Sequence, residues 1–87
     1  DLVKFCHPKV IYLKEYDKKN KTNYFETLYY YLKYNGNINL TAEKLFIHRN
    51  TMGYRIQKIE DILGMDLKNG ETAFQLNYSM RILCMLK

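Results

Sequence analysis

Residues able to contact nucleic acid gather in one short stretch of the chain, between His48 and Lys58. If the stretch is helical, each residue turns the chain by about 100° around the helix axis. The outer face then carries Asn50, Gly53, Tyr54, Gln57 and Lys58. The flanks of this face carry Arg49, Thr51 and Arg55. Most of these side chains can hydrogen-bond base edges or phosphates, and an arginine fork matches the O6 and N7 acceptors of guanine. Arg49 is therefore predicted to contact a base.

Two residues of this stretch have more than one candidate role. His48, at the start of the helix, is predicted to cap it or to contact phosphate, because no second ligand at suitable spacing supports a metal site or a catalytic base. Arg55 can hold phosphate or pair with Glu43 or Glu60. Asp61 lies farther along the outer face, where it would repel a polyanion. The first half of the helix is therefore the predicted contact end.

Two short helices joined by a tight turn must position these residues. The second helix repeats apolar side chains on one face at helical spacing: Met52, Ile56, Ile59 and Leu63. The first helix is expected over about residues 40–45, with apolar contacts from Ala42, Leu45 and Ile47. A helix that presents its first turns to the major groove, supported by the helix before it, is a helix-turn-helix, here over about residues 38–63.

The chain carries a family motif in this region. It resembles the C-terminal helix-turn-helix domain of PucR/CdaR-type bacterial transcriptional regulators in the segment TAEKLFIHRNTMGYRIQKIEDILG, which follows ETLYYYLKYNGNIN. It resembles the DNA-binding hairpin of Fis, a nucleoid protein, more distantly. The family pattern is matched at Thr27, Leu28, Tyr31, Leu32, residues 35–37, Thr41, Ala42, Leu45, residues 47–51, Tyr54, Arg55, Ile59, Leu63 and Gly64.

One departure from the family pattern is Gly53. Many relatives in the family carry a larger, often polar residue at this position. Because glycine is a poor helix former and has no side chain, it should lower the stability of the helix and remove a contact.

The resemblance implies sequence-specific binding of double-stranded DNA by the output domain of a cytoplasmic bacterial transcription regulator. It implies that the DNA contacts come from His48, Arg49, Asn50, Thr51, Gly53, Tyr54, Arg55 and Lys58. Similar domains usually end longer regulators, and this chain begins with Asp1 rather than methionine. We therefore expect a single domain over residues 1–87, the C-terminal fragment of a regulator whose N-terminal sensor domain is missing.

Size and composition agree with a small binding domain. The 87 residues allow one modest core, and the net charge of +5 fits an anionic partner. The chain shows no paired carboxylates, Ser/His/Asp set or glycine-rich phosphate loop in a plausible context, so neither an enzyme nor a cofactor is predicted. Cys6 and Cys84 show no ligand spacing with the two histidines, so neither a metal site nor a disulfide framework is expected. No apolar run is long enough to span a membrane.

Helical patterns precede the motif. Residues 7–8, His-Pro, suit a helix start, because proline at the first position loses only an amide hydrogen that has no partner there, and the polar run of residues 17–21 ends this helix. Thr22 or Asn23 is expected to cap a second helix that runs to about Tyr34. The buried stripe of that helix is predicted to be Phe25, Leu28, Tyr29 and Leu32.

The remaining connections complete an all-α prediction. Residues 35–37, Asn-Gly-Asn, turn the chain, and Asn39 or Thr41 is expected to cap the helix that follows. The nine tyrosines are interpreted as packing residues, because stacking on bases needs single-stranded nucleic acid. The sequence therefore predicts four or five helices, with a tri-helical core over residues 22–63 and flanking N- and C-terminal helices.

The last helix, expected from about Glu71 or Thr72, is apolar nearly all round. Its Leu76, Met80 and Leu83 side is expected to pack on the core, which leaves Phe74, Tyr78, Ile82 and Met85 for a partner. We predict a homodimer through this helix, because two-fold pairing matches palindromic half-sites; the missing upstream domain is the other candidate partner. The alternative function is a helical protein-interaction or dimerisation module with little DNA affinity of its own.

Overall fold

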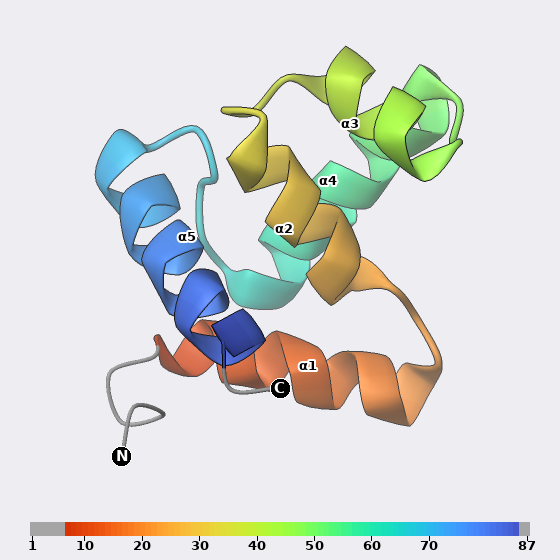
Figure 1. Cartoon of the computed structure of the whole chain (residues 1–87). Helices are drawn as coiled ribbons and strands as arrows, with labels where there is room; N and C mark the ends of the chain where they lie inside the picture. The colour runs from red at the N-terminus through yellow and green to blue at the C-terminus, as the bar shows by residue number, and fades with distance from the viewer. Residues whose placement is uncertain (1–6, 86–87) are drawn as a thin grey trace.

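The computed structural model describes residues 7–85, with side chains placed for residues 7–82. This part of the chain forms five helices and no strand, which confirms the predicted all-α fold (Figure 1). The helices are α1 (Pro8–Asn20), α2 (Tyr24–Lys33), α3 (Ile38–Leu45), α4 (Arg49–Leu63) and α5 (Gly70–Met85). The predictions for Cys6 and for the side chains of Leu83, Cys84 and Met85 lie outside the described residues.

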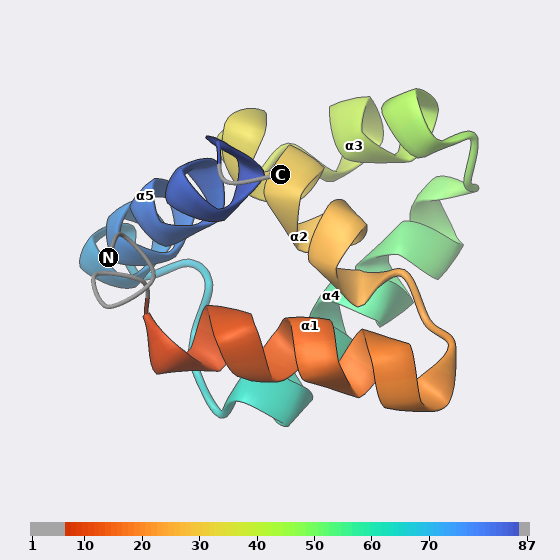
Figure 2. The ribbon, with the colours of Figure 1, turned by 60° about the horizontal axis from the view of Figure 1, so that its bottom comes forward.

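Helix α2 lies at the centre of the fold and contacts the other four helices. Helices α3 and α5 lie on opposite sides of α2, and α1 lies along one side of the bundle, in the view of Figure 1 and in the turned view of Figure 2. Leu13, Leu28 and Leu63, from α1, α2 and α4, are fully buried in one shared core. Helices α2, α3 and α4 contact one another, as predicted for the tri-helical core, and α1 and α5 flank it.

Helix α1 begins at Pro8 and is joined to α5 at its start. The Nδ1 atom of His7, the N-cap, accepts a hydrogen bond from the Lys9 amide at 3.1 Å, which agrees with the predicted helix start. The His7 amide donates to Ser79 Oγ on α5 at 2.7 Å. Ser79 is a buried polar residue in the otherwise apolar last helix, and it links the first helix to the last.

The N-cap of α2 comes from the preceding helix. Asn23 occupies the cap position but makes no side-chain cap hydrogen bond. Asp17, in the last turn of α1, accepts instead from the Tyr24 amide at 2.9 Å and from the Phe25 amide at 2.7 Å. The Thr22 hydroxyl also donates to this carboxylate. The prediction of a Thr22 or Asn23 cap was therefore wrong, because a carboxylate close in space satisfies the first amides of α2.

Helix α3 begins at Ile38, ahead of the predicted residue 40. Its N-cap is Asn37, whose Oδ1 accepts a hydrogen bond from the Leu40 amide at 3.0 Å. The prediction that Asn39 or Thr41 would cap this helix was wrong. Thr41 is fully buried, and its hydroxyl donates to the Asn37 carbonyl at 2.8 Å. The turn that ends α2 therefore also caps α3.

Helix α2 buries Tyr31, not the predicted Tyr29. Tyr31 is 5% exposed, whereas Tyr29 and Phe25 are half-buried. Because α2 has helices on several sides, its buried surface is wider than the single stripe that the sequence predicted. Burial raises the pKa of the Tyr31 hydroxyl, and the Glu60 and Asp66 carboxylates raise it further. The raised pKa keeps this hydroxyl neutral to a higher pH than an exposed tyrosine would reach.

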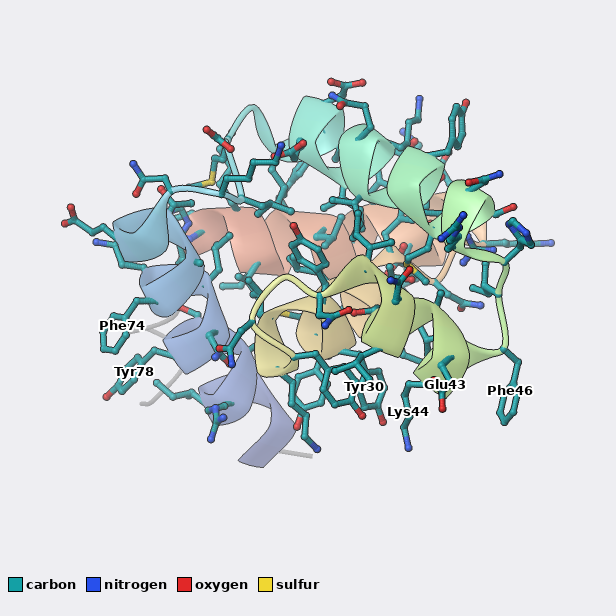
Figure 3. The ribbon with its side chains drawn as sticks, turned by 90° about the horizontal axis from the view of Figure 1, so that it is seen from above. Tyr30, Glu43, Lys44, Phe46, Phe74 and Tyr78 are labelled. Atoms are coloured by element: carbon teal, nitrogen blue, oxygen red, sulfur yellow. The ribbon has the colours of Figure 1, made fainter. Side chains whose placement is uncertain are left out.

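Helix α5 leaves less apolar surface for a partner than predicted. Leu76 and Met80 are fully buried, as expected. Ile82, predicted to face a partner, is only 9% exposed, because α5 packs against both α1 and α2 and so buries more than one side. Phe74 and Tyr78 remain 71% and 56% exposed and point outward from α5 (Figure 3).

Candidate nucleic-acid interface

A tight turn joins α3 to α4. Phe46 has a φ of 56°, the left-handed conformation that ends many helices. Its amide donates to the Glu43 carbonyl at 3.3 Å, and the Ile47 amide donates to the Ala42 carbonyl at 2.9 Å. These two bonds satisfy carbonyls at the end of α3 that have no partner within the helix. The two helices therefore meet in the arrangement predicted for a helix-turn-helix.

His48 caps the recognition helix α4. Its Nδ1 accepts a hydrogen bond from the Asn50 amide at 3.1 Å, which confirms the predicted capping role. Because Nδ1 is an acceptor here, the proton of the neutral ring lies on Nε2. The side chain is exposed, so Nε2–H is a donor at the start of α4, where the helix dipole also favours an anion.

The outer face of α4 carries the predicted contact residues. The inner face is the apolar stripe, with Met52 and Ile59 fully buried, and Tyr54 on the outer side is 71% exposed. The structure places all eight predicted site residues on α4 or its cap. Six of them are exposed, namely His48, Arg49, Asn50, Thr51, Tyr54 and Lys58, whereas Gly53 and Arg55 are half-buried. The predicted helical spacing therefore brings them together as one surface.

The charge of α4 changes along its length. Arg55 forms no ion pair with Glu43 or Glu60 in the described part of the chain; Glu60 Oε2 accepts the Leu67 amide at 2.9 Å instead. Asp61 is exposed beyond the basic end. The first turn of α4 contains no acidic residue. An anion is therefore favoured at the N-terminal half of α4 and disfavoured at its C-terminal half.

Sequence patterns missed one exposed residue next to this face. Phe46, in the turn itself, is 96% exposed. It stands between Leu45 and Ile47, which were predicted to make apolar contacts, and no role was predicted for Phe46 itself. The one sequence signal for its exposure is that the helical spacing of apolar residues ends at Leu45. A residue that follows the end of a helix no longer has to face the core.

Gly53 offers a test of the α4 geometry. A Cβ built at Gly53 would meet no atom within 4 Å, so alanine fits there. Because alanine is about 0.5–1 kcal/mol more favourable than glycine inside a helix, Gly53→Ala is expected to raise the free energy of unfolding by that amount. Urea denaturation followed by circular dichroism measures the change. Gly64→Ala is the control and should be less stable than the wild type, because Gly64 has a φ of +64°, which disfavours alanine. A Gly53→Ala variant less stable than the wild type would contradict the helical conformation and open surroundings of Gly53.

No metal site accompanies the recognition helix in the described residues, where no group of three or more His, Cys, Asp or Glu side chains converges. A hollow of about 600 Å³ lies away from α4, between the end of α2 and the start of α5. Tyr31 and Leu67 line it together with Lys68 and Phe74. The α4 surface is therefore suited to contact an extended partner and not to enclose a small molecule.

Comparison with known proteins also indicates a helix-turn-helix domain. Residues 24–82 match the family described as the PucR C-terminal helix-turn-helix domain. The chain is 37% identical over 82 residues to the purine catabolism regulatory protein of Bacillus subtilis, covering 94% of this chain and 15% of that protein. It is 33% identical over 70 residues to the DNA-binding transcriptional activator AdeR of Bacillus subtilis, covering 80% of this chain and 17% of the relative.

The proline-responsive transcriptional activator PutR of Bacillus subtilis is 37% identical over 71 residues, covering 82% of this chain and 17% of PutR. The chain therefore spans only a small part of the length of these relatives. No solved structure gave a significant match to the chain.

Proposed function

Because the chain belongs to the family of PucR C-terminal helix-turn-helix domains, and so is the DNA-binding domain of a transcriptional regulator, we propose that it recognises a specific sequence in double-stranded DNA. The observation that carries this proposal is the exposed basic and polar face of α4 above a fully packed inner stripe. The relatives described above are named as a regulatory protein and as two transcriptional activators. A helix-turn-helix reads the major groove with such a face.

Each site residue has a proposed role in this complex. Arg49, Asn50, Thr51 and Tyr54 face the base edges, and Gly53 lies among them without a side chain of its own. Arg55, Lys58 and His48 hold the phosphate backbone, and His48 does so through its Nε2–H group. Phosphate contacts set the register of the helix, and base contacts supply the sequence preference.

A duplex-binding assay at several salt concentrations tests the proposal. Lys58→Ala is expected to weaken binding to all duplexes alike and to reduce the slope of log affinity against log salt by roughly one, because one phosphate contact is lost. Fluorescence anisotropy with a selected duplex and with unrelated duplexes measures both quantities. Lys68→Ala, an exposed lysine beyond the end of α4, is the matched control and should leave the slope unchanged. Binding that shows neither salt dependence nor sequence preference would refute the proposed function.

The parent regulator is a further part of the proposal. Since the chain spans about a sixth of the matched relatives, we propose that a larger sensor domain precedes it in a cytoplasmic regulator. No helix in the described part of the chain is long and apolar enough to cross a membrane. AdeR and PutR are named as transcriptional activators, and we propose that activation is also an outcome of DNA binding by this chain's parent protein.

Pairing of two copies is proposed through α5. Phe74 and Tyr78 form an exposed aromatic pair on this helix, and one recognition helix alone reads only a few base pairs. Sedimentation at tens of micromolar is expected to show a dimer, and Phe74→Lys with Tyr78→Lys is expected to give a monomer, because buried lysines would oppose pairing. A wild-type monomer, or a dimer that persists in the double variant, would reject pairing through α5.

A further inference from the structure

Three exposed lysines gather where α1 ends and the chain turns into α2, here called the basic corner and made of Lys18, Lys19 and Lys21. Lys18 and Lys19 lie in the last turn of α1, and Lys21 is its C-cap, with a φ of 55°. None of the three forms an ion pair within the part of the chain that the structure describes. Like charge is therefore concentrated on one exposed part of the surface, which favours an anionic partner.

The acidic residue nearest to the basic corner in the chain is directed inward. Asp17 is half-buried, and its two carboxylate oxygens accept hydrogen bonds from the amides of Tyr24 and Phe25 at the start of α2. Glu15 and Glu26, the next acidic residues on either side, form no ion pair with the corner among the described residues. The outward side of the corner therefore stays basic.

The lysines of the corner also have a local role. Cations in the last turn of a helix offset the partial negative charge at its C-terminus, and Lys18 and Lys19 hold such positions in α1. Lys21 lies beyond the last helical residue, Asn20, and so is not needed for this role. A purely local role would affect the stability of the domain and leave DNA binding unchanged, so experiment can distinguish the two.

The basic corner lies at the same end of the molecule as the start of the recognition helix. The loop from α1 to α2 and the turn from α3 to α4 both lie on the right in Figures 1 and 2, whereas α1 begins on the left. Helices α2, α3 and α4 form the tri-helical core, so the corner directly precedes the first helix of that core. In homeodomains, which also read the major groove with a third helix, the chain before the first helix reaches the DNA beside that groove.

We propose that the basic corner holds the DNA phosphate backbone beside the groove that α4 reads. This inference rests on the proposed function, because it assigns a second contact within the same complex. Lysine acts on phosphate as a point charge and phosphate contacts carry no sequence information, so the corner adds affinity at any sequence. The domain extends 38 Å along its longest axis, close to one DNA turn of roughly 34–36 Å, so it can contact phosphates outside the bases that α4 reads.

Two triple variants of the 87-residue chain test this contact. The corner variant removes the three charges of the basic corner: Lys18→Gln, Lys19→Gln and Lys21→Gln. The control variant removes three exposed lysines outside the corner: Lys9→Gln, Lys33→Gln and Lys68→Gln. Each variant lowers the net charge of +5 by three, so any difference between them comes from the position of the charges. Circular dichroism and urea denaturation measure the fold and the stability of both.

The probe is a duplex selected by binding from a random-sequence pool and used in two lengths. The long form carries nearly one extra turn of DNA on each side of the selected bases, and the trimmed form ends at those bases. The trimmed form lacks the flanking phosphates that the corner would hold. Fluorescence anisotropy at several salt concentrations gives the affinity of each protein for each form and the slope of log affinity against log salt.

On the long duplex, the corner variant is expected to bind about 10- to 100-fold more weakly than the wild type near 0.1 M salt, with a slope lower by about two to three, because up to three phosphate contacts are lost. The control variant should stay within about threefold of the wild type, since salt screens charges that lie far from the duplex. Trimming should weaken the wild type and the control variant and leave the corner variant nearly unchanged, because the corner and the flanking phosphates act as one pair.

Equal affinities of the corner and control variants for the long duplex would overturn the inference, and so would an equal loss on trimming in the corner variant and the wild type. Either result leaves the proposed function standing if the wild type still prefers the selected sequence. A wild-type chain that binds no duplex would refute both. If the corner variant does not fold, the ¹⁵N-labelled wild type decides: the amide resonances of residues 18–21 should shift with the long duplex and not with the trimmed one, and equal shifts would reject the contact.

Discussion

Replacing Arg49 with alanine is expected to weaken binding to the preferred duplex by about 1–3 kcal/mol, roughly 5- to 150-fold, and to relax the preference at one base pair. Arg49 is the first residue of α4 and is exposed there, beside the His48 cap. A helix that enters the major groove by its N-terminus brings this position to the base edges first. The guanidinium fork can then pair with two acceptors of one guanine, which alanine cannot do.

Anisotropy titrations against the preferred duplex and single-base variants of it measure both effects. Arg81→Ala is the control, since Arg81 is exposed on α5, where its Nε donates to Asn77 at 3.3 Å. The control should bind all duplexes as the wild type does. Unchanged affinity and unchanged preference in Arg49→Ala at low salt would show that the assigned groove face is wrong.

Replacing Asp17 with alanine is expected to lower the free energy of unfolding by about 2 kcal/mol. The Asp17 carboxylate accepts hydrogen bonds from the amides of Tyr24 and Phe25 and from the Thr22 hydroxyl. Bonds to a charged acceptor are stronger than those between neutral groups. Their loss leaves the first amides of the central helix without a protein acceptor, so α2 and its contacts with α1 are weakened together.

Urea denaturation measured by circular dichroism checks this value, with Asn23→Ala as the matched control. Asn23 occupies the cap position of α2 by sequence but makes no side-chain cap bond, so its replacement should change stability by only a few tenths of a kcal/mol. If Asn23→Ala were the more destabilised variant, the cap would belong to Asn23 as the sequence predicted, and the cap by Asp17 would be wrong.

The candidate site was predictable because it depends on one regular helix. The side chains of α4 follow the helical period, so the apolar stripe that includes Met52 and Ile59 defines the opposite, exposed face. The capping role of His48 was also predictable, because a cap acts on amides within a few residues of itself. The sequence could not place Phe46, which lies beyond the last turn of α3, where no period applies.

The sequence by itself determined that this protein is all-α, where its five described helices begin to within about two residues, and which face of the recognition helix is exposed. Only the tertiary structure decided that Asp17 caps α2, that Tyr31 is buried instead of Tyr29, and that Ile82 faces inward. The reason is physical. Helical period and local capping act between neighbours in the chain, whereas burial on a helix with several neighbours, and a cap donated from another helix, depend on where distant segments pack.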